Sequence, residues 1–306
     1  MRVCVVGCGA VGSLFAANLA QLDDVEVWAY DLARDHVDAI NEHGLRLSGA
    51  GKVRSRPRAT ADAGELPACD FGIVATKAMH TSAAVAAAAH AFRDGCVASV
   101  QNGIGNEEAI AEYVARVIRG TTFPAGKLVE PGHVQWDVKG DTTLGPFEPQ
   151  PAPQDEIERL ADACTRGGMP TRAVSDARGP QWRKLIFNAA TNPLGALTRL
   201  THGRVCERPD LRALVTGLVD EGKAVAGAQG IGLDADPEEL IDHAARRDVA
   251  YEHKASMLQD VEAKRATEVD FLNGGIVRFG REHGVPTPLN GAIWALVKGL
   301  EASWTS

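Results

Sequence analysis

The chain has 306 residues, of which 45% are hydrophobic and 24% are charged. Because domains commonly span about 100–200 residues, this length favours two domains, and the composition is that of an ordinary globular protein. The formal net charge of −8, without a long block of like charge, argues against binding to nucleic acid or to an anionic membrane surface, although it permits one local basic pocket for a small anion.

The first half of the chain alternates short apolar strands with helices. The expected strands are 2–6, 25–30, 71–76 and 96–101, with more strands between 120 and 147 and one at 171–174. The expected helices are 11–22, 33–42, 82–92 and 154–166. Such alternation predicts an α/β domain whose mostly parallel sheet is covered by helices on both faces.

The second half of the chain has a different pattern. After Gly179-Pro180 the strand signal ends, and long helical segments continue from there. We therefore expect a boundary near Asp176, with a dinucleotide-binding domain at 1–175 and an all-helical domain at 176–306.

The cysteines and the apolar segments indicate the cellular compartment of the protein. Six cysteines include no C-x-x-C pair, which argues against a disulfide scaffold or a structural zinc site and favours a reducing cytoplasm. Glycines at 7, 9 and 12 interrupt the apolar N-terminal stretch, so we do not expect an export signal. The run Val85–Ala89 is far shorter than the ~20 residues that cross a bilayer.

A glycine-rich turn lies directly between the first expected strand and the first expected helix. It has the pattern G-x-G-x-x-G, in Gly7-Cys8-Gly9-Ala10-Val11-Gly12. Glycine suits this position because the turn is tight, the backbone must approach a pyrophosphate, and the helix packs close to the strand. The helix N-terminus also offers free N–H groups to phosphates. The alternative is a tight turn that binds no ligand.

Asp31 lies at the end of the second expected strand, 19 residues after Gly12. An acid at that point accepts hydrogen bonds from the ribose hydroxyls of NAD and disfavours the 2′-phosphate of NADP. Arg34 could still reach a phosphate, so NADP stays possible. Asp31 could also cap the helix that follows, and the two roles are compatible.

Three polar residues recur at intervals of four in the helical half, namely Lys184, Asn188 and Asn192. On a helix this spacing places them along one side, and the apolar run Leu185–Phe187 buries part of the same helix. A lysine with two asparagines on such a helix is costly to bury unless it meets a polar ligand. A solvated polar stripe is the equally weighted alternative.

A second polar group follows further along the chain. Thr267 with Asp270 resembles a capping box, so we expect a helix to begin there with Glu268 in its first turn. Ser256 lies 12 residues before Glu268, which corresponds to ~120° around an ideal helix. The two side chains could reach one site only if the helix breaks before Thr267. Glu268 could equally be a favourable acid at a helix N-terminus.

Taken together, these segments resemble the ketopantoate reductases (2-dehydropantoate 2-reductases). The resemblance extends in order over nearly the whole chain: Val5-x-Gly7-Cys8-Gly9-Ala10-Val11-Gly12, then Val100-Gln101-Asn102-Gly103-Ile104-Gly105-Asn106-Glu107, then Lys184-x-x-x-Asn188-x-x-x-Asn192-Pro193, then Ser256-Met257-x-x-Asp260 through Thr267-Glu268. It implies a Rossmann domain joined to an all-helical domain, with substrate bound in the cleft between them, and a homodimer. It also implies hydride transfer from a reduced nicotinamide cofactor to the ketone of a small 2-oxo acid.

The resemblance also implies roles for single residues. Lys184 matches the family's catalytic lysine, the proton donor to the forming alkoxide. Glu268 matches the acid that positions that lysine and the substrate, and it is also expected to contact the cofactor. The matching substrate contacts are Asn188, Asn192, Ser256 and Asn102, the last of which also lies at the nicotinamide. Lys77 matches a lysine on the cofactor side.

The chain departs from the family in two places. At the end of the second expected strand, members that prefer NADP usually carry a basic residue, but this chain has Asp31. The second departure lies just before Ser256. The run before Ser256 is typically Asn-x-Ser, but here it is His253-Lys254-Ala255. His253 is either a new substrate donor, which favours an altered substrate, or a surface residue. A 3-hydroxyacid dehydrogenase is a second enzyme hypothesis, since those families share the lysine with an asparagine four residues on. A dinucleotide sensor without turnover is the non-enzymatic alternative, and it would have no need of both Lys184 and Glu268.

Overall fold

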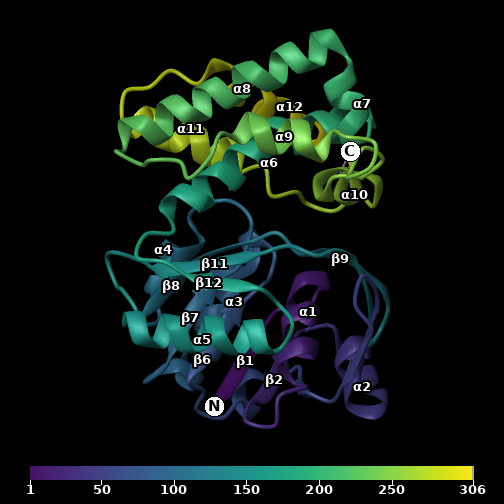
Figure 1. The fold of residues 1–306 in the computed structure, drawn as a ribbon, viewed down its shortest axis with the longest axis vertical. Helices are drawn as coiled ribbons and strands as arrows, with labels where there is room; N and C mark the ends of the chain where they lie inside the picture. Colours follow the sequence, from purple (N-terminus) through teal and green to yellow (C-terminus); the bar gives the residue numbers. More distant parts are fainter. Residues whose placement is uncertain (305–306) are drawn as a thin grey trace. The chain divides into compact units, whose positions relative to one another are not determined.

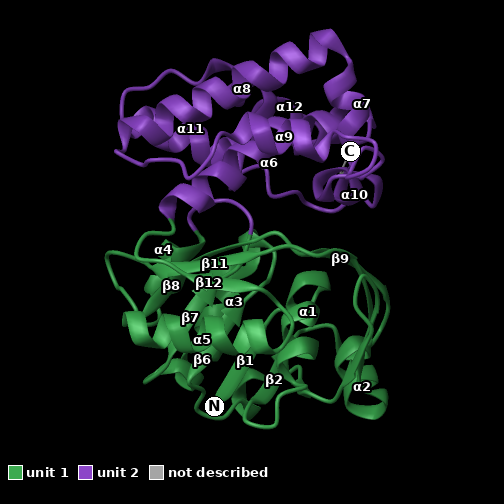
Figure 2. Cartoon of the chain, viewed as in Figure 1, with its two compact units in different colours: residues 1–101, 106–177 green, residues 102–105, 178–306 purple. Residues whose placement is uncertain are grey.

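The computed structural model describes residues 1–304 and divides the chain into two compact units (Figure 2). Unit 1 contains residues 1–101 and 106–177, and unit 2 contains residues 102–105 together with the chain from residue 178 onward. The sequence pattern did not predict that residues 102–105 belong to the second unit.

An eight-stranded sheet forms the centre of unit 1 (Figure 1). In spatial order its strands are β12 (Thr171–Ala173), β11 (Thr142–Pro146), β8 (Val117–Thr122), β7 (Cys96–Ser99), β6 (Phe71–Val74), β1 (Arg2–Val6), β2 (Glu26–Tyr30) and β5 (Arg58–Thr60). All neighbours in it pair in parallel except β8 and β11, which are antiparallel. The prediction of a mostly parallel α/β sheet is therefore confirmed.

Helices cover both faces of this sheet, because successive side chains of a strand point to opposite faces. Val3 and Val5 of β1 pack into one apolar cluster, which also holds residues of α1 (Ala10–Leu19) and α5 (Gln154–Arg166). Cys4 and Val6 pack into a second cluster, with residues of α3 (Thr81–Ala88) and α4 (Asn106–Ala111). The remaining helices of unit 1 are α2 (Arg34–His43) and the 3-10 turns η1 (Ala63–Glu65), η2 (Ala78–His80) and η3 (Ala89–Phe92).

A second, four-stranded sheet in unit 1 was not expected. Its order is β4 (Val53–Ser55), β3 (Leu45–Gly49), β10 (His133–Val138) and β9 (Ala125–Glu130). The strands expected between 120 and 147 are thus divided between two sheets, because β9 and β10 form a hairpin that pairs with β3 rather than with the main sheet. The short strands between 45 and 60 carry too little periodic signal to be recognised locally.

Unit 2 is all helical and has one apolar core. Its helices are α6 (Arg178–Thr198), α7 (His202–Glu207), α8 (Pro209–Ala228), α9 (Pro237–Ala244), α10 (Ser256–Glu262), α11 (Asn273–Glu282) and α12 (Pro288–Ala302). The central helix α6 is long, mostly buried, and contains Pro193 in its interior. The prediction that strands give way to helices in the second half is confirmed.

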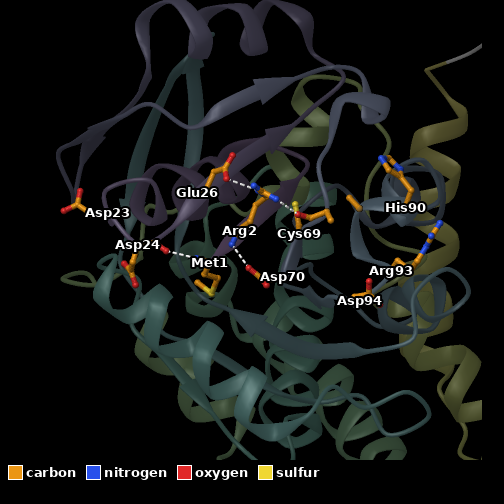
Figure 3. A pocket seen from close by; sticks show the side chains of 12 residues that line it. Met1, Arg2, Asp23, Asp24, Glu26, Cys69, Asp70, His90, Arg93 and Asp94 are labelled. Carbon is orange, nitrogen blue, oxygen red and sulfur yellow. Dashed lines mark hydrogen bonds and ion pairs between the residues drawn. The ribbon is translucent and has the colours of Figure 1, made fainter.

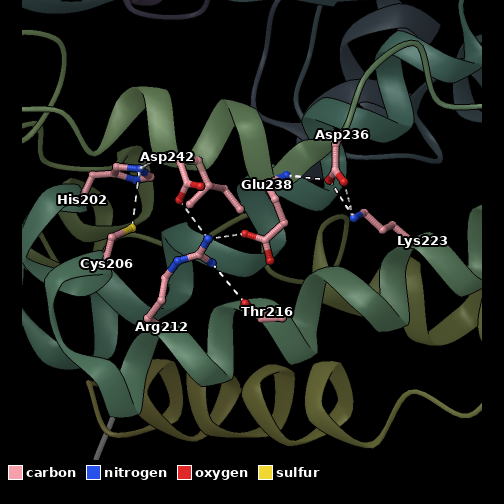
Figure 4. Close-up of polar contacts among 9 residues, drawn as sticks. His202, Cys206, Arg212, Thr216, Lys223, Asp236, Glu238 and Asp242 are labelled. Carbon is pink, nitrogen blue, oxygen red and sulfur yellow. Dashed lines mark hydrogen bonds and ion pairs between the residues drawn. The ribbon is translucent and has the colours of Figure 1, made fainter.

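Polar contacts attach α9 to α8 inside unit 2 (Figure 4). The Arg212 guanidinium pairs with the carboxylates of Glu238 and Asp242 and donates to the Thr216 hydroxyl at 3.2 Å. The Lys223 ammonium donates to Asp236 at 2.8 Å, and the other Asp236 oxygen accepts from the Glu238 N–H at the start of α9. Because one arginine contacts two carboxylates of α9, these charge-assisted hydrogen bonds fix the orientation of α9 on α8.

The expected helix start at Thr267 is wrong. The chain leaves α10 at Glu262, passes Lys264 with a φ of 51°, and resumes a helix only at Asn273. The Thr267 hydroxyl donates instead to the Glu301 carboxylate at 2.7 Å, and the Thr267 N–H donates to the same oxygen at 2.8 Å. Glu301 thus holds Thr267 in a turn, and the break that Ser256 and Glu268 require is present.

Among residues 1–304, no helix is both long enough and apolar enough to cross a membrane. In the same part of the chain, His, Cys, Asp and Glu residues nowhere form a group of three that could hold a metal ion.

Candidate active site

The glycine-rich turn has the geometry that its sequence requires. Gly7 has a φ of 87°, and a Cβ there would lie 2.7 Å from the Thr76 nitrogen. A Cβ on Gly12 would lie 1.9 Å from the Gly7 carbonyl oxygen, so the first turn of α1 could not pack on the strand end. Gly9 is different, because a Cβ there would meet no atom within 4 Å. Close contacts within the protein explain why positions 7 and 12 are glycine. Gly9 has no such contact, and it leaves open space above the N-terminus of α1.

Asp31 accepts a hydrogen bond from the glycine-rich turn. One of its carboxylate oxygens accepts from the Cys8 N–H at 2.6 Å, and the other accepts from the Ala33 N–H at 2.8 Å. The residue before α2 is Ala33, so Asp31 does not take the N-cap position itself. A carboxylate offers about four acceptor sites, so Asp31 can receive ribose hydroxyls in addition to these two bonds.

A buried histidine that the sequence did not single out supports the same turn. The Gly132 N–H donates to Nδ1 of His36 at 3.0 Å, which leaves Nε2 as the protonated nitrogen, 3.3 Å from the Ser13 hydroxyl. Ser13 in turn donates to the Cys8 carbonyl at 2.8 Å. Burial lowers the pKa of His36, so the neutral form that this pattern needs is favoured, although the Asp31 carboxylate opposes that shift.

Two further unit 1 residues lie at the carboxyl ends of the strands. Lys77 follows β6, is partly buried, and immediately precedes the short turn η2. Gln101 follows β7, and its amide donates to the Thr76 carbonyl at 3.0 Å and to the Thr81 hydroxyl at 2.7 Å. The ends of β6 and β7 are therefore held together at the edge of the sheet where the glycine-rich turn lies.

In unit 2 the structure brings Asn188, Asn102 and Glu268 into one line of polar side chains. The Asn188 amide donates to the Asn102 side-chain oxygen at 3.4 Å, and the Asn102 amide donates to the Glu268 carboxylate at 3.4 Å. Asn188 and Glu268 are only 7% and 6% exposed, respectively. Residues that are far apart in sequence thus form a single polar group inside the helical unit.

Lys184 lies one helical turn before Asn188 on α6. Burial lowers the pKa of its ammonium to about 8, and the Glu268 carboxylate acts in the opposite direction. The residue as a whole is partly exposed, so the side chain can be reached while its surroundings are poor in water. A lysine whose pKa lies this close to neutrality can donate its proton as an acid and be reprotonated at physiological pH.

The other predicted substrate contacts are Asn192, Ser256 and His253. Asn192 lies a further turn along α6, is 7% exposed, and accepts from the Thr191 hydroxyl at 3.5 Å. Ser256 is the first residue of α10 and is exposed. His253 is also exposed, and its backbone carbonyl accepts from the His202 N–H at 3.1 Å. The role of His253 in substrate binding stays a prediction.

Glycines in the segment 102–105 make the contact between Asn102 and Glu268 possible. Gly103 has a φ of 85°, and a Cβ there would lie 2.6 Å from the Phe271 carbonyl oxygen. The Ile104 N–H donates to that same carbonyl at 3.1 Å. Gly103 thus allows the segment 102–105 to pack against the turn that holds Glu268, a contact that the local sequence pattern does not reveal.

The cavity of unit 1 shown in Figure 3 lies at the wrong end of the sheet for this chemistry. It has a volume of about 510 Å³ and is lined by Met1 and Arg2 at the start of β1, by Glu26 at the start of β2, and by Asp70 just before β6. Ligands of open α/β sheets bind at the carboxyl ends of the strands. The carboxylates of Asp23, Asp24 and Asp94 in its lining would also repel an anionic ligand.

The comparisons with known proteins agree with this arrangement. The sequence model described as "Ketopantoate reductase PanE/ApbA" matches residues 3–149, and its C-terminal counterpart matches residues 176–301. The 2-dehydropantoate 2-reductase of Pyrococcus horikoshii is 35% identical over 304 residues, with 99% of this chain and 98% of the relative covered. That of Archaeoglobus fulgidus is 34% identical, with 98% of both chains covered.

Solved structures show the same similarity. A ketopantoate reductase of the PanE/ApbA family from Ralstonia eutropha JMP134 matches with a TM-score of 0.89 at 29% identity, and the match covers both chains completely. D-mandelate dehydrogenase with NADH and anilino(oxo)acetate matches with a TM-score of 0.90 at 27% identity, also over both whole chains. The chain belongs to the ketopantoate reductase family, and the resemblance found in its sequence is confirmed.

Proposed function

We propose that this protein is an oxidoreductase that transfers a hydride from a reduced nicotinamide cofactor to the ketone of a small 2-oxo acid, with 2-dehydropantoate as the first candidate substrate. The observation that carries the proposal is the buried polar line from Asn188 through Asn102 to Glu268, beside a lysine whose pKa is about 8. A non-catalytic dinucleotide sensor has no use for such a lysine.

The residues of unit 1 fit a dinucleotide. Open space above Gly9 and the free N–H groups at the start of α1 suit a pyrophosphate, and Asp31 suits the ribose hydroxyls of NAD. When bound, the reduced nicotinamide supplies the hydride. Asp31 favours NADH, and NADPH is the second candidate because Arg34 lies exposed three residues away. The NADH in the D-mandelate dehydrogenase structure supports this choice.

Lys184 is the proposed proton donor. As a hydride adds to the carbonyl carbon, negative charge develops on the oxygen, and a charged donor stabilises that oxyanion more than it stabilises the ketone. The proton then passes from Nζ of Lys184 to the oxygen, which gives the alcohol and a neutral amine. Glu268 keeps the lysine protonated before the step, because its carboxylate raises the pKa that burial lowers.

The amides and the hydroxyl complete the proposed substrate site. Asn188 and Asn192 offer N–H donors to the substrate carboxylate, and Asn102 and Ser256 offer further polar groups. His253 replaces an asparagine that is typical of the family, and we propose that it alters which substituent of the 2-oxo acid is accepted. D-mandelate dehydrogenase among the structural neighbours supports a search beyond 2-dehydropantoate.

We also propose which part of the chain binds each ligand. Residues 1–175 would hold the dinucleotide, and residues 176–306 would hold the substrate acid and the contact of a homodimer in the cytoplasm. Light scattering coupled to gel filtration measures the mass in solution directly, and a mass near the 32.4 kDa of a single chain would contradict the dimer.

The test of the function is a matrix of two cofactors and a panel of 2-oxo acids. Oxidation of NADH and NADPH is followed with 2-dehydropantoate, other branched 2-oxo acids and aryl 2-oxo acids. Turnover with at least one acid is expected, with NADH preferred. Turnover only with 3-hydroxy acids in the reverse direction would identify a 3-hydroxyacid dehydrogenase. Tight NADH binding without oxidation by any acid would identify a sensor.

A further inference from the structure

Pro193 removes one hydrogen bond from the interior of α6. In an α-helix the carbonyl of residue i accepts from the N–H of residue i+4, and proline has no N–H. The carbonyl of Ala189 therefore lacks its normal helical donor. It accepts instead from the side-chain amide of Asn273, at 2.9 Å. Asn273 is the first residue of α11, so another helix replaces the donor that the proline removed.

This bond is the last in a chain of buried polar groups with a fixed direction. The Asn273 amide also donates to the Asn290 side-chain oxygen at 3.0 Å, and the Asn290 amide donates to the Glu221 carboxylate at 2.8 Å. Both asparagines are completely buried. Because a carboxylate only accepts, Asn290 must turn its amide toward Glu221 and its oxygen toward Asn273. Asn273 must then present its amide, and Ala189 receives it.

The side-chain oxygen of Asn273 shows how strongly this orientation is imposed. It is buried and has no hydrogen-bond partner among the described residues. Rotating the amide by 180° would not help, because the oxygen would then face the carbonyl of Ala189 and the oxygen of Asn290, which are both acceptors. The fold tolerates an unsatisfied oxygen in order to keep the bond to α6.

Asn273 contacts α6 between the residues of the candidate site. Ala189 directly follows Asn188, and Pro193 directly follows Asn192. On its own side, Asn273 lies five residues after Glu268 at the end of a closed turn. In that turn the Leu272 N–H donates to the Glu268 carbonyl at 3.1 Å, and the Gly274 N–H donates to the Val269 carbonyl at 2.9 Å. Asn273 therefore connects the turn of Glu268 to the helix of Lys184.

We propose that Asn273 is a positioning residue for the active site. By satisfying the Ala189 carbonyl it holds α6 at its proline, so that Lys184 and Asn188 keep their places relative to Glu268. It does not touch substrate, since it is completely buried. The inference rests on the proposed function for its meaning in turnover, but the placement of Lys184 can be measured without turnover.

The test uses Asn273→Ala, Pro193→Ala and the double variant. Asn273→Ala is expected to lower kcat at least ~10-fold and to move the basic limb of the kcat profile to lower pH, because a displaced Glu268 no longer raises the pKa of Lys184. Pro193→Ala supplies an N–H that can bond the Ala189 carbonyl. In its background the Asn273→Ala change should cost less than ~3-fold.

A matched control lies on the same helix. The Thr198 hydroxyl donates to the Leu194 carbonyl at 2.6 Å, but residue 198 also has its own N–H. Thr198→Val should therefore leave the pH limb in place. A second readout, the 13C NMR titration of the Lys184 side chain, follows the same shift in protein that turns over no substrate. It separates failure of this inference from failure of the proposed function.

Three results would overturn the inference. The first is an unchanged kcat in Asn273→Ala, and the second is a kcat loss that follows a lowered Tm while the pKa of Lys184 stays in place. The third is a shifted limb that Pro193→Ala does not rescue, since Asn273 would then act elsewhere than on the Ala189 carbonyl. If Asn273→Ala does not fold, the double variant compared with Pro193→Ala decides alone: a loss above ~10-fold there contradicts the proposal.

Discussion

The side-chain amide of Asn102 donates a hydrogen bond to the carboxylate of Glu268 at 3.4 Å, across 166 positions of sequence. This contact lies within unit 2, because the segment 102–105 belongs to that unit together with Glu268. The same asparagine accepts from Asn188, so it orients both neighbours at once. The proposed chemistry depends on this group, and the following predictions test its members.

Turnover should depend on both ionisable groups. If Lys184 donates the proton and Glu268 maintains its charge, Lys184→Ala and Glu268→Gln should each lower kcat at least ~10²-fold. Steady-state kinetics with the best 2-oxo acid measures this, and NADH affinity serves as the control for intact cofactor binding. Rates near those of the unaltered protein in both variants would refute the assignment.

The rate should fall as the pH rises through about 8, the pKa to which burial lowers that of Lys184, because only the ammonium can donate a proton. The Glu268 carboxylate raises this pKa. In Glu268→Gln, the residual activity should therefore begin to fall at a lower pH than in the unaltered protein. A kcat profile between pH 6 and 10 checks both. A limb that stays in place without the carboxylate would show that Glu268 does not act on Lys184.

The buried lysine should cost stability at neutral pH. The pKa of Lys184 is about 8 in the folded protein against an ordinary 10.5, so the unfolded chain binds more protons between these values. Folding stability from this residue therefore rises with pH from about 8 to 10.5 and is lowest below that window. Lys184→Met should have a higher Tm than the unaltered protein at pH 7, and the difference should shrink by pH 10.5.

Thermal unfolding at several pH values measures that difference. Titration of other groups affects both proteins alike, so only the difference in Tm is interpreted. Lys223→Met is a suitable control, because the Lys223 side chain is 32% exposed and forms a solvent-exposed ion pair with Asp236. A difference between Lys184→Met and the unaltered protein that stays constant with pH would contradict the lowered pKa.

The glycine-rich turn offers a pair of substitutions that separate packing from ligand binding. Gly12→Ala should destabilise the fold, since its Cβ would lie 1.9 Å from the Gly7 carbonyl oxygen. Gly9→Ala should leave the Tm unchanged, because its Cβ meets no protein atom and the backbone φ of −62° suits alanine. It should nevertheless weaken NADH binding at least ~10-fold if a pyrophosphate occupies that space. Unchanged NADH binding by a folded Gly9→Ala would indicate a turn that binds no pyrophosphate.

Cofactor choice should follow the charge at position 31. Asp31→Arg removes the carboxylate that is proposed to bind the ribose hydroxyls and adds a cation, so the ratio of kcat/KM should move toward NADPH. The substitution also removes the acceptor of the Cys8 N–H, so Asp31→Asn, which keeps an acceptor oxygen, is the control for the turn itself. Selectivity that stays the same in Asp31→Arg would argue against the ribose role.

The sequence by itself determined the fold class, the family and the positions of the polar residues. Strong local signals explain this: an apolar strand followed by G-x-G-x-x-G, the 154–166 helix found at those same bounds, and the i, i+4 spacing of Lys184 and Asn188 on α6. Each depends on neighbours within one element, so periodicity and turn chemistry are sufficient to reveal it.

Only the tertiary structure decided how those residues meet. The capping-box reading of Thr267 failed because Glu301, far along the chain, competes for its N–H and hydroxyl. The move of 102–105 into the helical unit depends on how closely Gly103 approaches Phe271, and the substitute donor for Pro193 comes from Asn273. These are contacts between elements distant in sequence, and local pattern carries no information about such partners because burial and hydrogen-bond competition are settled by the whole fold.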